Sequence, residues 1–166
     1  IVGRSLKTMA QFSHIDADGK AVMVDVSKKD ITERSATAEG SVFMQPETLR
    51  RIIDGGVKKG DVLSVARLAG IMGAKKTSEL IPLCHPLTLT AIVVELRCDL
   101  ERDGVDITAT CRLAGRTGVE MEALTAVAVT ALPIYVMCKA VDRGMRVGDI
   151  HLTAKSGGQS GEYEAE

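Results

Sequence analysis

The sequence is almost without aromatic side chains, which make up 2% of its 166 residues and include no Trp. Proteins that bind single-stranded nucleic acid stack bases on aromatic side chains, so the sequence disfavours this class. The formal net charge of −1 gives no general attraction to nucleic acid either. An RNA-binding domain is therefore the weakest functional hypothesis for this chain.

Cysteine and histidine are also scarce, with four Cys and three His in the whole chain. Cys84, Cys98, Cys111 and Cys138 are far apart and lack the spacing of zinc ligands. We therefore expect free thiols in a reducing, cytoplasmic environment. We expect neither a metal nor another cofactor.

Long apolar runs are missing as well. No stretch approaches the roughly 18–20 continuous apolar residues of a membrane span, so we expect no membrane contact. Apolar residues make up 45% and charged residues 26% of the chain, which is ordinary for a globular protein. The length predicts a single domain over residues 14–166, preceded at residues 1–13 by a flexible arm or an added leader.

Alternation of apolar and polar residues predicts a β-hairpin in the middle of the chain. Residues 87–100 and 105–113 both alternate, and Asp103-Gly104 between them is a strong hairpin-turn signal. One buried face and one solvent-exposed face are typical of an antiparallel sheet. The residues expected to point inward are Ile92, Val94, Leu96, Cys98, Leu100, Val105, Ile107, Ala109, Cys111 and Leu113.

A long apolar helix is predicted at residues 118–141. Thr117 and Glu120 form a capping-box signature at its start, and Lys139 near its end suits the helix dipole. Earlier helices are predicted from Pro46 to Gly55 and over residues 61–76. Further strands are predicted at residues 21–26, 33–43 and 147–154. The major elements follow the order βαββαβ, which predicts an α+β, ferredoxin-like antiparallel sheet with helices packed on one face.

Three groups of residues go beyond these structural roles. The first is Cys84-His85, which two prolines hold in a rigid, extended loop at residues 80–86. The second is a set of lysines that includes Lys155, which is followed by small residues able to bring backbone N–H groups to an anion. The third is the long helix, where Glu122 and Lys139 lie about 25 Å apart and cannot pair within one helix. A homo-oligomer with shared sites would use both.

Four motifs give the chain a family resemblance. They are PLCHP at residues 82–86, RTGVEMEAL at 116–124, IYVMCKAV at 134–141 and AKSGG at 154–158. Together they resemble cyclic pyranopterin monophosphate synthase, the protein-C family of molybdenum cofactor biosynthesis, from about His14 to Gly161. The resemblance implies conversion of 3′,8-cyclo-7,8-dihydro-GTP to cyclic pyranopterin monophosphate with release of pyrophosphate. It also implies a homo-hexamer, a trimer of dimers, with sites at subunit interfaces.

The resemblance also assigns roles to individual residues. Lys139 would carry protons in catalysis, which a lysine can do where burial or neighbouring cations lower its pKa. The expected substrate contacts are Leu83, Cys84, His85, Glu120, Met121 and Glu122. The candidate cations for the triphosphate are Lys59, Lys75, Lys155 and Arg34, and we group Lys59 with the catalytic residues.

One position departs from the family pattern. The family has an aspartate three residues before the catalytic lysine, where this chain has Val136. A carboxylate there would share a helix face with Lys139 and could orient or exchange its proton, whereas valine can do neither. The sequence therefore predicts an intact fold and substrate site with impaired turnover. The alternative hypothesis is a non-catalytic oligomeric module that binds a phosphorylated purine or pterin.

Overall fold

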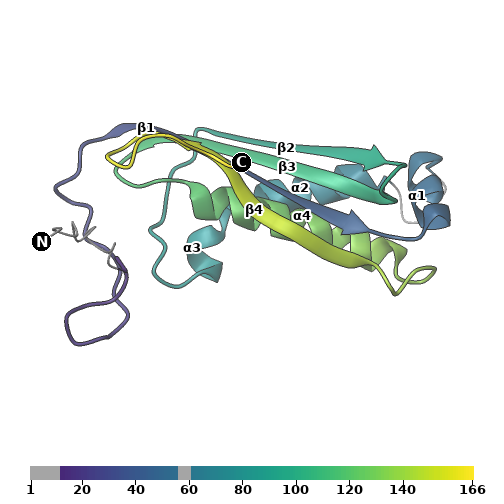
Figure 1. The fold of residues 1–166 in the computed structure, drawn as a ribbon, viewed down its shortest axis with the longest axis horizontal. Helices are drawn as coiled ribbons and strands as arrows, with labels where there is room; N and C mark the ends of the chain where they lie inside the picture. Colours follow the sequence, from purple (N-terminus) through teal and green to yellow (C-terminus); the bar gives the residue numbers. More distant parts are fainter. Residues whose placement is uncertain (1–11, 56–60) are drawn as a thin grey trace, which may run out of the picture.

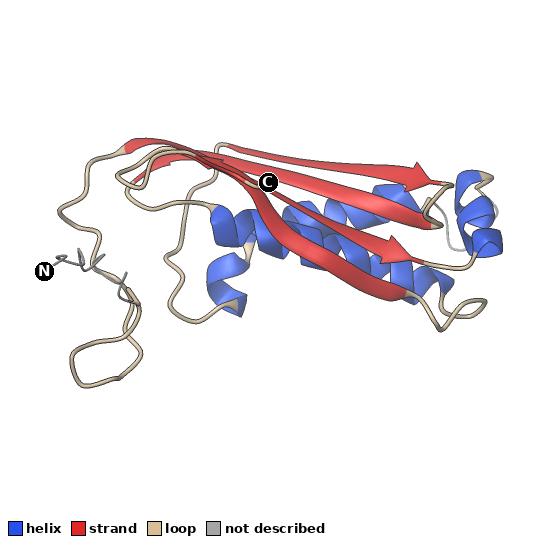
Figure 2. Ribbon diagram, in the orientation of Figure 1, coloured by secondary structure: helices blue, strands red, loops and turns tan. Residues whose placement is uncertain are grey.

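A computed structural model describes residues 12–55 and 61–166, and Figures 1 and 2 show its elements in two layers. One layer is a β-sheet and the other is made of helices, which lie along one face of the sheet. The strands are β1 (Thr32–Phe43), β2 (Ala91–Asp99), β3 (Gly104–Gly115), β4 (Arg146–Ser156) and β5 (Tyr163–Glu164). The helices are α1 (Pro46–Ile53), α2 (Val62–Lys75), α3 (Thr77–Leu80) and α4 (Glu120–Cys138).

The sheet has the strand order β2-β3-β1-β4-β5, and every neighbouring pair is antiparallel. β1 lies at the centre, where it pairs with β3 along its whole length, from Thr32 opposite Gly115 to Phe43 opposite Gly104. The first four strands and their crossover helices have the βαββαβ arrangement, which confirms the predicted α+β fold. The short strand β5 was not predicted, because a two-residue strand carries no periodic signal.

The core lies between the sheet and the helices. All five residues of β3 that were predicted to point inward are buried. In β2, Val94 is buried and Ile92, Leu96 and Cys98 pack against the core. Leu100 was predicted to point inward, and this is wrong. It is 63% exposed because β2 ends at Asp99 and Leu100 already belongs to the turn.

Helix α4 runs beneath the sheet and packs closely against α2. A Cβ atom on Gly70 of α2 would lie 2.0 Å from Thr130 Oγ1 of α4, so only glycine allows this approach. Among the described residues, α4 is the one helix that is long and apolar enough to span a membrane by length and composition alone. Its buried residues, which include Val127 and Ile134, lie in the core of the domain. We therefore interpret α4 as a core helix.

Three local predictions were wrong. The capping box does not form: α4 begins at Glu120, its N-cap is Val119, and no side chain caps it. Glu120 instead extends toward Lys155, and its Oε1 lies 3.6 Å from the lysine Nζ. Residues 21–26 form no strand, since only Ala21 pairs there, in an isolated bridge with Ile15. The short helix α3 ends at Leu80, inside a stretch that was predicted to be an extended loop.

Candidate functional site

The first turn of α4 borders a cavity of about 360 Å³, which we call the acid–base cavity. The loop after α3 and residues 13–29 of the N-terminal segment form its other walls. Three segments far apart in the sequence therefore meet at one end of α4. The cavity is lined by Ser13, His14, Val24, Val26, Lys29, Leu83, Cys84, His85, Leu87, Thr117, Gly118, Glu120, Met121 and Glu122.

His85 is held in a single orientation in this cavity. Its Nε2 lies 2.8 Å from the backbone oxygen of Val24, and because a carbonyl can only accept, Nε2 donates the hydrogen. In the neutral ring, Nδ1 is then free to accept a proton. The preceding turn is strained, because Leu83 has a φ of 69°, a left-handed conformation that is rare outside glycine. The loop therefore fixes the position of the imidazole.

Glu122 is a buried acid beside Cys84. Only 4% of Glu122 is exposed. Burial raises the pKa of its carboxyl above the usual range, and the nearby charge of Glu120 raises this pKa further. Burial also raises the pKa of the Cys84 thiol, with a smaller contribution from Glu122. The cavity thus contains a carboxyl and a thiol that both retain their protons to a higher pH than in water.

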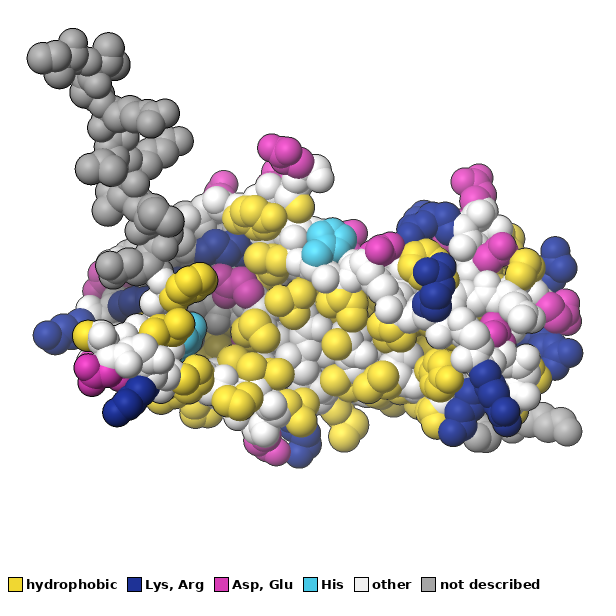
Figure 3. Space-filling model, turned by 60° about the horizontal axis from the view of Figure 1, so that its bottom comes forward, with side chains coloured by type: hydrophobic (Ala, Val, Ile, Leu, Met, Phe, Trp, Pro, Cys, Tyr) yellow, Lys and Arg dark blue, Asp and Glu magenta, His cyan; other side chains and the backbone are white. Residues whose placement is uncertain are grey.

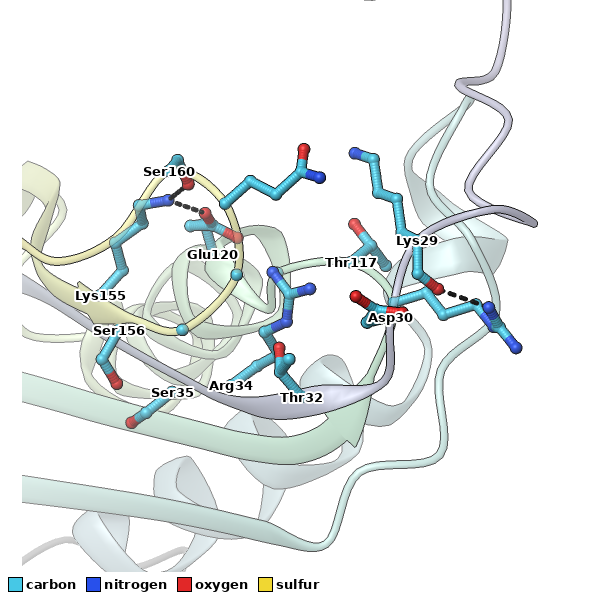
Figure 4. A pocket seen from close by; sticks show the side chains of 15 residues that line it. Lys29, Asp30, Thr32, Arg34, Ser35, Thr117, Glu120, Lys155, Ser156 and Ser160 are labelled. Atoms are coloured by element: carbon cyan, nitrogen blue, oxygen red, sulfur yellow. Dashed lines mark hydrogen bonds and ion pairs between the residues drawn. The ribbon is translucent and has the colours of Figure 1, made fainter.

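A second cavity of about 410 Å³, which we call the cation cavity, lies beside the first. Arg34 from β1 and Lys155 from β4 face it, and Figure 4 shows their side chains on either side of Glu120. Arg34 Nε donates a hydrogen bond to the backbone oxygen of Gly115 at 3.3 Å, which fixes the guanidinium. Lys155 pairs with Glu120 and hydrogen-bonds to Ser160.

The glycine turn after Lys155 fits closely over Arg34. Gly157 and Gly158 have φ values of 94° and 77°. A Cβ on Gly158 would lie 1.8 Å from Arg34 Nη1, and one on Gly157 would lie 2.0 Å from the backbone oxygen of Glu33. Both positions therefore require glycine for conformation and for space. The turn lies against the guanidinium and closes one side of the cation cavity.

The two cavities adjoin each other. Lys29, Thr117, Gly118 and Glu120 line both of them. The predicted substrate contacts Leu83, Cys84, His85, Glu120, Met121 and Glu122 thus share one site with the predicted cations Arg34 and Lys155. A polar cleft with cations at one end and titratable groups at the other can hold a phosphorylated ring compound.

Three of the predicted site residues that the structure describes are not in this cleft. Lys75 is exposed at the end of α2 and lines neither cavity. Val136 and Lys139 lie at the opposite end of α4, where Lys139 is the exposed C-cap and Val136 is 50% exposed. Lys59 lies outside the described residues. A single copy of the chain therefore does not bring Lys139 to His85 and Glu122.

The cleft also contains residues that the sequence did not single out. Lys29 and Asp30 come from the segment before β1, which has no periodic pattern, and nothing in the sequence places it near AKSGG. Arg116 stands in a family motif, but no role was assigned to it. Within residues 12–55 and 61–166, no cluster of three or more His, Cys, Asp or Glu side chains could hold a metal ion.

Comparison with known proteins gives a consistent result. A family profile described as the MoaC family matches residues 23–158. The chain belongs to this family. A cyclic pyranopterin monophosphate synthase from Rhodospirillum rubrum is 67% identical over 153 residues, which cover 92% of this chain and 92% of that protein. The proteins of the same name from Parvibaculum lavamentivorans and Dinoroseobacter shibae are 59% and 60% identical, over 93% and 95% of this chain and 97% and 100% of their own lengths.

MoaC membership confirms the resemblance deduced from the four motifs. The matched region contains β1, the loop at residues 82–86, α4 and the Lys155–Gly158 turn. It therefore includes every residue that lines the cleft except Ser13, His14, Gln159 and Ser160.

Proposed function

We propose that this chain is a cyclic pyranopterin monophosphate synthase that acts in molybdenum cofactor biosynthesis on a cyclised derivative of GTP. The observation that carries this proposal is the junction of the cation cavity and the acid–base cavity at the first turn of α4. A triphosphate requires several cations, and rearranging a purine requires positioned proton donors and acceptors. The cleft has both, side by side.

The charge distribution indicates how the substrate lies in the cleft. We place its triphosphate in the cation cavity, against Arg34, Lys155 and the Gly157-Gly158 turn. The purine-derived ring then lies over the acid–base cavity, near His85 and Glu122. Arg34 is a two-pronged donor and suits a phosphate with several oxygens. We leave Lys75 without a defined role here, since it lines neither cavity.

The acid–base cavity supplies the groups that can move protons. Glu122 retains its proton to a higher pH than an exposed glutamate, because burial raises its pKa, and it can therefore act as an acid. His85 has Nδ1 free to accept a proton, since Nε2 is committed to Val24. We assign these two residues to proton transfer on the ring, with Leu83, Cys84 and Met121 as its apolar contacts.

The C-terminal end of α4 takes part in the same reaction in our proposal, because a second copy of the chain supplies it to the cleft. We propose a homo-hexamer, a trimer of dimers, in which Lys139 of one copy reaches the cleft of another. The exposed positions of Val136 and Lys139 support this arrangement, as does the apolar outer surface of the helices in Figure 3. Because Val136 occupies the position of the family aspartate, we propose that turnover is impaired. We also propose a cytoplasmic location, consistent with four free cysteines.

Purified chain and 3′,8-cyclo-7,8-dihydro-GTP test the function directly. Calorimetry should detect binding, and mass spectrometry should detect slow formation of cyclic pyranopterin monophosphate together with pyrophosphate. Binding without any product over a long incubation would favour the non-catalytic binding module. Absence of binding would contradict both hypotheses.

A further inference from the structure

The N-terminal segment forms a wall of the cleft. Residues 24–31, which we call the strap, run from the acid–base cavity to the start of β1. Two turns shape the strap. Asp25 Oδ1 accepts a hydrogen bond from the backbone N–H of Ser27 at 2.9 Å, and the N–H of Lys29 donates to the oxygen of Val26 at 3.0 Å. The strap therefore has a defined local structure.

Two residues of the cleft hold the strap in place. His85 donates to the oxygen of Val24 at one end. Arg116 Nη1 donates to the oxygen of Ser27 at 3.0 Å and also to the oxygen of Lys29, toward the other end. Arg116 comes directly after β3 and is attached to the sheet, so its guanidinium ties the strap to the rigid part of the fold. Both anchors bind backbone oxygens, so neither of them occupies a side chain of the strap.

Lys29 is the strap residue that these anchors present to the cleft. It lines both cavities, and in Figure 4 its side chain extends into the open space across from Lys155, with Arg34 between them. Lys155 is already paired with Glu120. Among the described residues, no acidic side chain lies within 4.0 Å of the Lys29 ammonium. Lys29 is thus a cation of the cleft whose charge is available to a ligand.

We propose that Lys29 is a further substrate-binding residue, which contacts a phosphate oxygen, and that Arg116 is a positioning residue that holds the strap so that Lys29 reaches it. This inference rests on the proposed function. Lys29, Arg34 and Lys155 come from the strap, β1 and β4, so a phosphate chain in the cation cavity meets cations from three sides. Each contact between an ammonium and a phosphate oxygen is a charge-assisted hydrogen bond, stronger than a neutral one.

Calorimetry with 3′,8-cyclo-7,8-dihydro-GTP and with inorganic triphosphate tests the role of Lys29. Because Val136 slows turnover in our proposal, binding can be measured on the natural chain. Lys29→Met should weaken binding of both ligands about tenfold, and Lys29→Arg should restore most of the affinity. Lys28→Met is the matched control, since Lys28 is on the same strap but lines neither cavity, and it should bind normally.

The outcomes separate this inference from the proposed function. Equal effects of Lys28→Met and Lys29→Met would mean that only general charge is felt, and would overturn the role of Lys29. Normal binding by Lys29→Met would do the same and leave the proposed function standing. If the natural chain binds neither ligand, the proposed function fails and this inference fails with it.

Limited proteolysis tests the role of Arg116. Arg116→Met should expose the Lys28 and Lys29 peptide bonds to trypsin and weaken triphosphate binding, while thermal stability of the sheet changes little. The lysine in Arg116→Lys can form only some of the hydrogen bonds to Ser27 and Lys29. Its trypsin sensitivity and its affinity for triphosphate should therefore lie between those of Arg116→Met and the natural chain. If the strap of Arg116→Met resists trypsin as the natural strap does, and binding is normal, Arg116 does not position Lys29.

Discussion

The two ends of α4 differ sharply. At its N-terminal end, the loop after α3, the strap and the Lys155–Gly158 turn form a cleft with the first turn of α4. At its C-terminal end, Val136 is half exposed and Lys139 projects from the surface as the C-cap. Among the described residues, one chain therefore builds a cleft at one end of α4 and leaves Val136 and Lys139 exposed at the other.

This difference separates the proposed binding cleft, with His85 and Glu122, from Lys139. The described residues that we assign to the triphosphate and the ring lie within one chain, whereas the lysine expected to carry protons lies about 25 Å away along the helix. A second copy of the chain can bring the two ends together, and a residue change at the exposed end then affects turnover without affecting binding. We propose that Val136 is such a change.

Val136→Asp should have the largest effect. The carboxylate would stand one turn before Lys139 on the same helix face and restore its proton partner. Positioned acids and bases contribute about 10²–10⁴-fold, so kcat should rise by that order while KM stays nearly constant. Rates of pyranopterin formation from the cyclised GTP substrate measure this.

Val136→Asn is the control for this change, because it adds polarity and a similar shape without a titratable group. It should remain as slow as the natural chain. Equal kcat values for Val136→Asp and the natural chain would show that position 136 does not limit turnover.

Gly158→Ala should weaken ligand binding in the cleft by a smaller factor, about tenfold. Its Cβ would lie 1.8 Å from Arg34 Nη1, so the guanidinium must leave its position in the cation cavity. Gly161→Ala is the matched control, because Gly161 has a similar φ of 68° but nothing within 4 Å of its Cβ. Both variants should lose about 1–2 kcal/mol of stability through the left-handed conformation. Only Gly158→Ala should lose affinity for inorganic triphosphate. Equal affinities of the two variants would contradict the proposed role of the Gly157-Gly158 turn and Arg34 in phosphate binding.

Glu122→Gln should change the pH dependence of stability, which is the smallest of these effects. The pKa of Glu122 is raised by burial above its ordinary value of 4.5 in the folded chain. Between these two values the folded state binds more protons than the unfolded state, so the free energy of unfolding falls as pH rises through this window. Urea denaturation at several pH values should show a smaller fall for Glu122→Gln. The exposed control Glu164→Gln should retain the fall seen in the natural chain, and an unchanged profile for Glu122→Gln would argue against a buried, protonated carboxyl.

The sequence was most informative where burial follows a strict period. Alternation in β2 and β3 predicted their inward residues, because a strand with one buried face must place apolar side chains at every second position. It was least informative where tertiary contacts override local preference. Glu120 was predicted to cap its own helix, but it pairs with Lys155 from β4, a residue 35 positions later. No local pattern could indicate that contact.

Tertiary contacts also explain why the sequence predicted only part of the cleft. Cys84, His85, Glu122 and Lys155 stand in recognisable motifs, and the fold brings them together. Lys29 contributes through the path of an irregular segment, which is set by carbonyl contacts to His85 and Arg116 and not by side-chain periodicity. Such backbone contacts leave no mark in the order of residues, so the strap could not be predicted.

Complementation between two inactive variants tests most directly the claim that the two ends of α4 act in one site only across chains. In the Val136→Asp background, His85→Ala would disable the cleft at the N-terminal end of α4. Lys139→Ala would disable the exposed C-terminal end. Each variant alone should be inactive. In a co-expressed mixture about half of the dimers contain one copy of each variant, and one of the two sites in such a dimer joins two intact ends. About a quarter of full activity should therefore return. A mixture as inactive as its parts, despite proven co-assembly, would contradict the shared site.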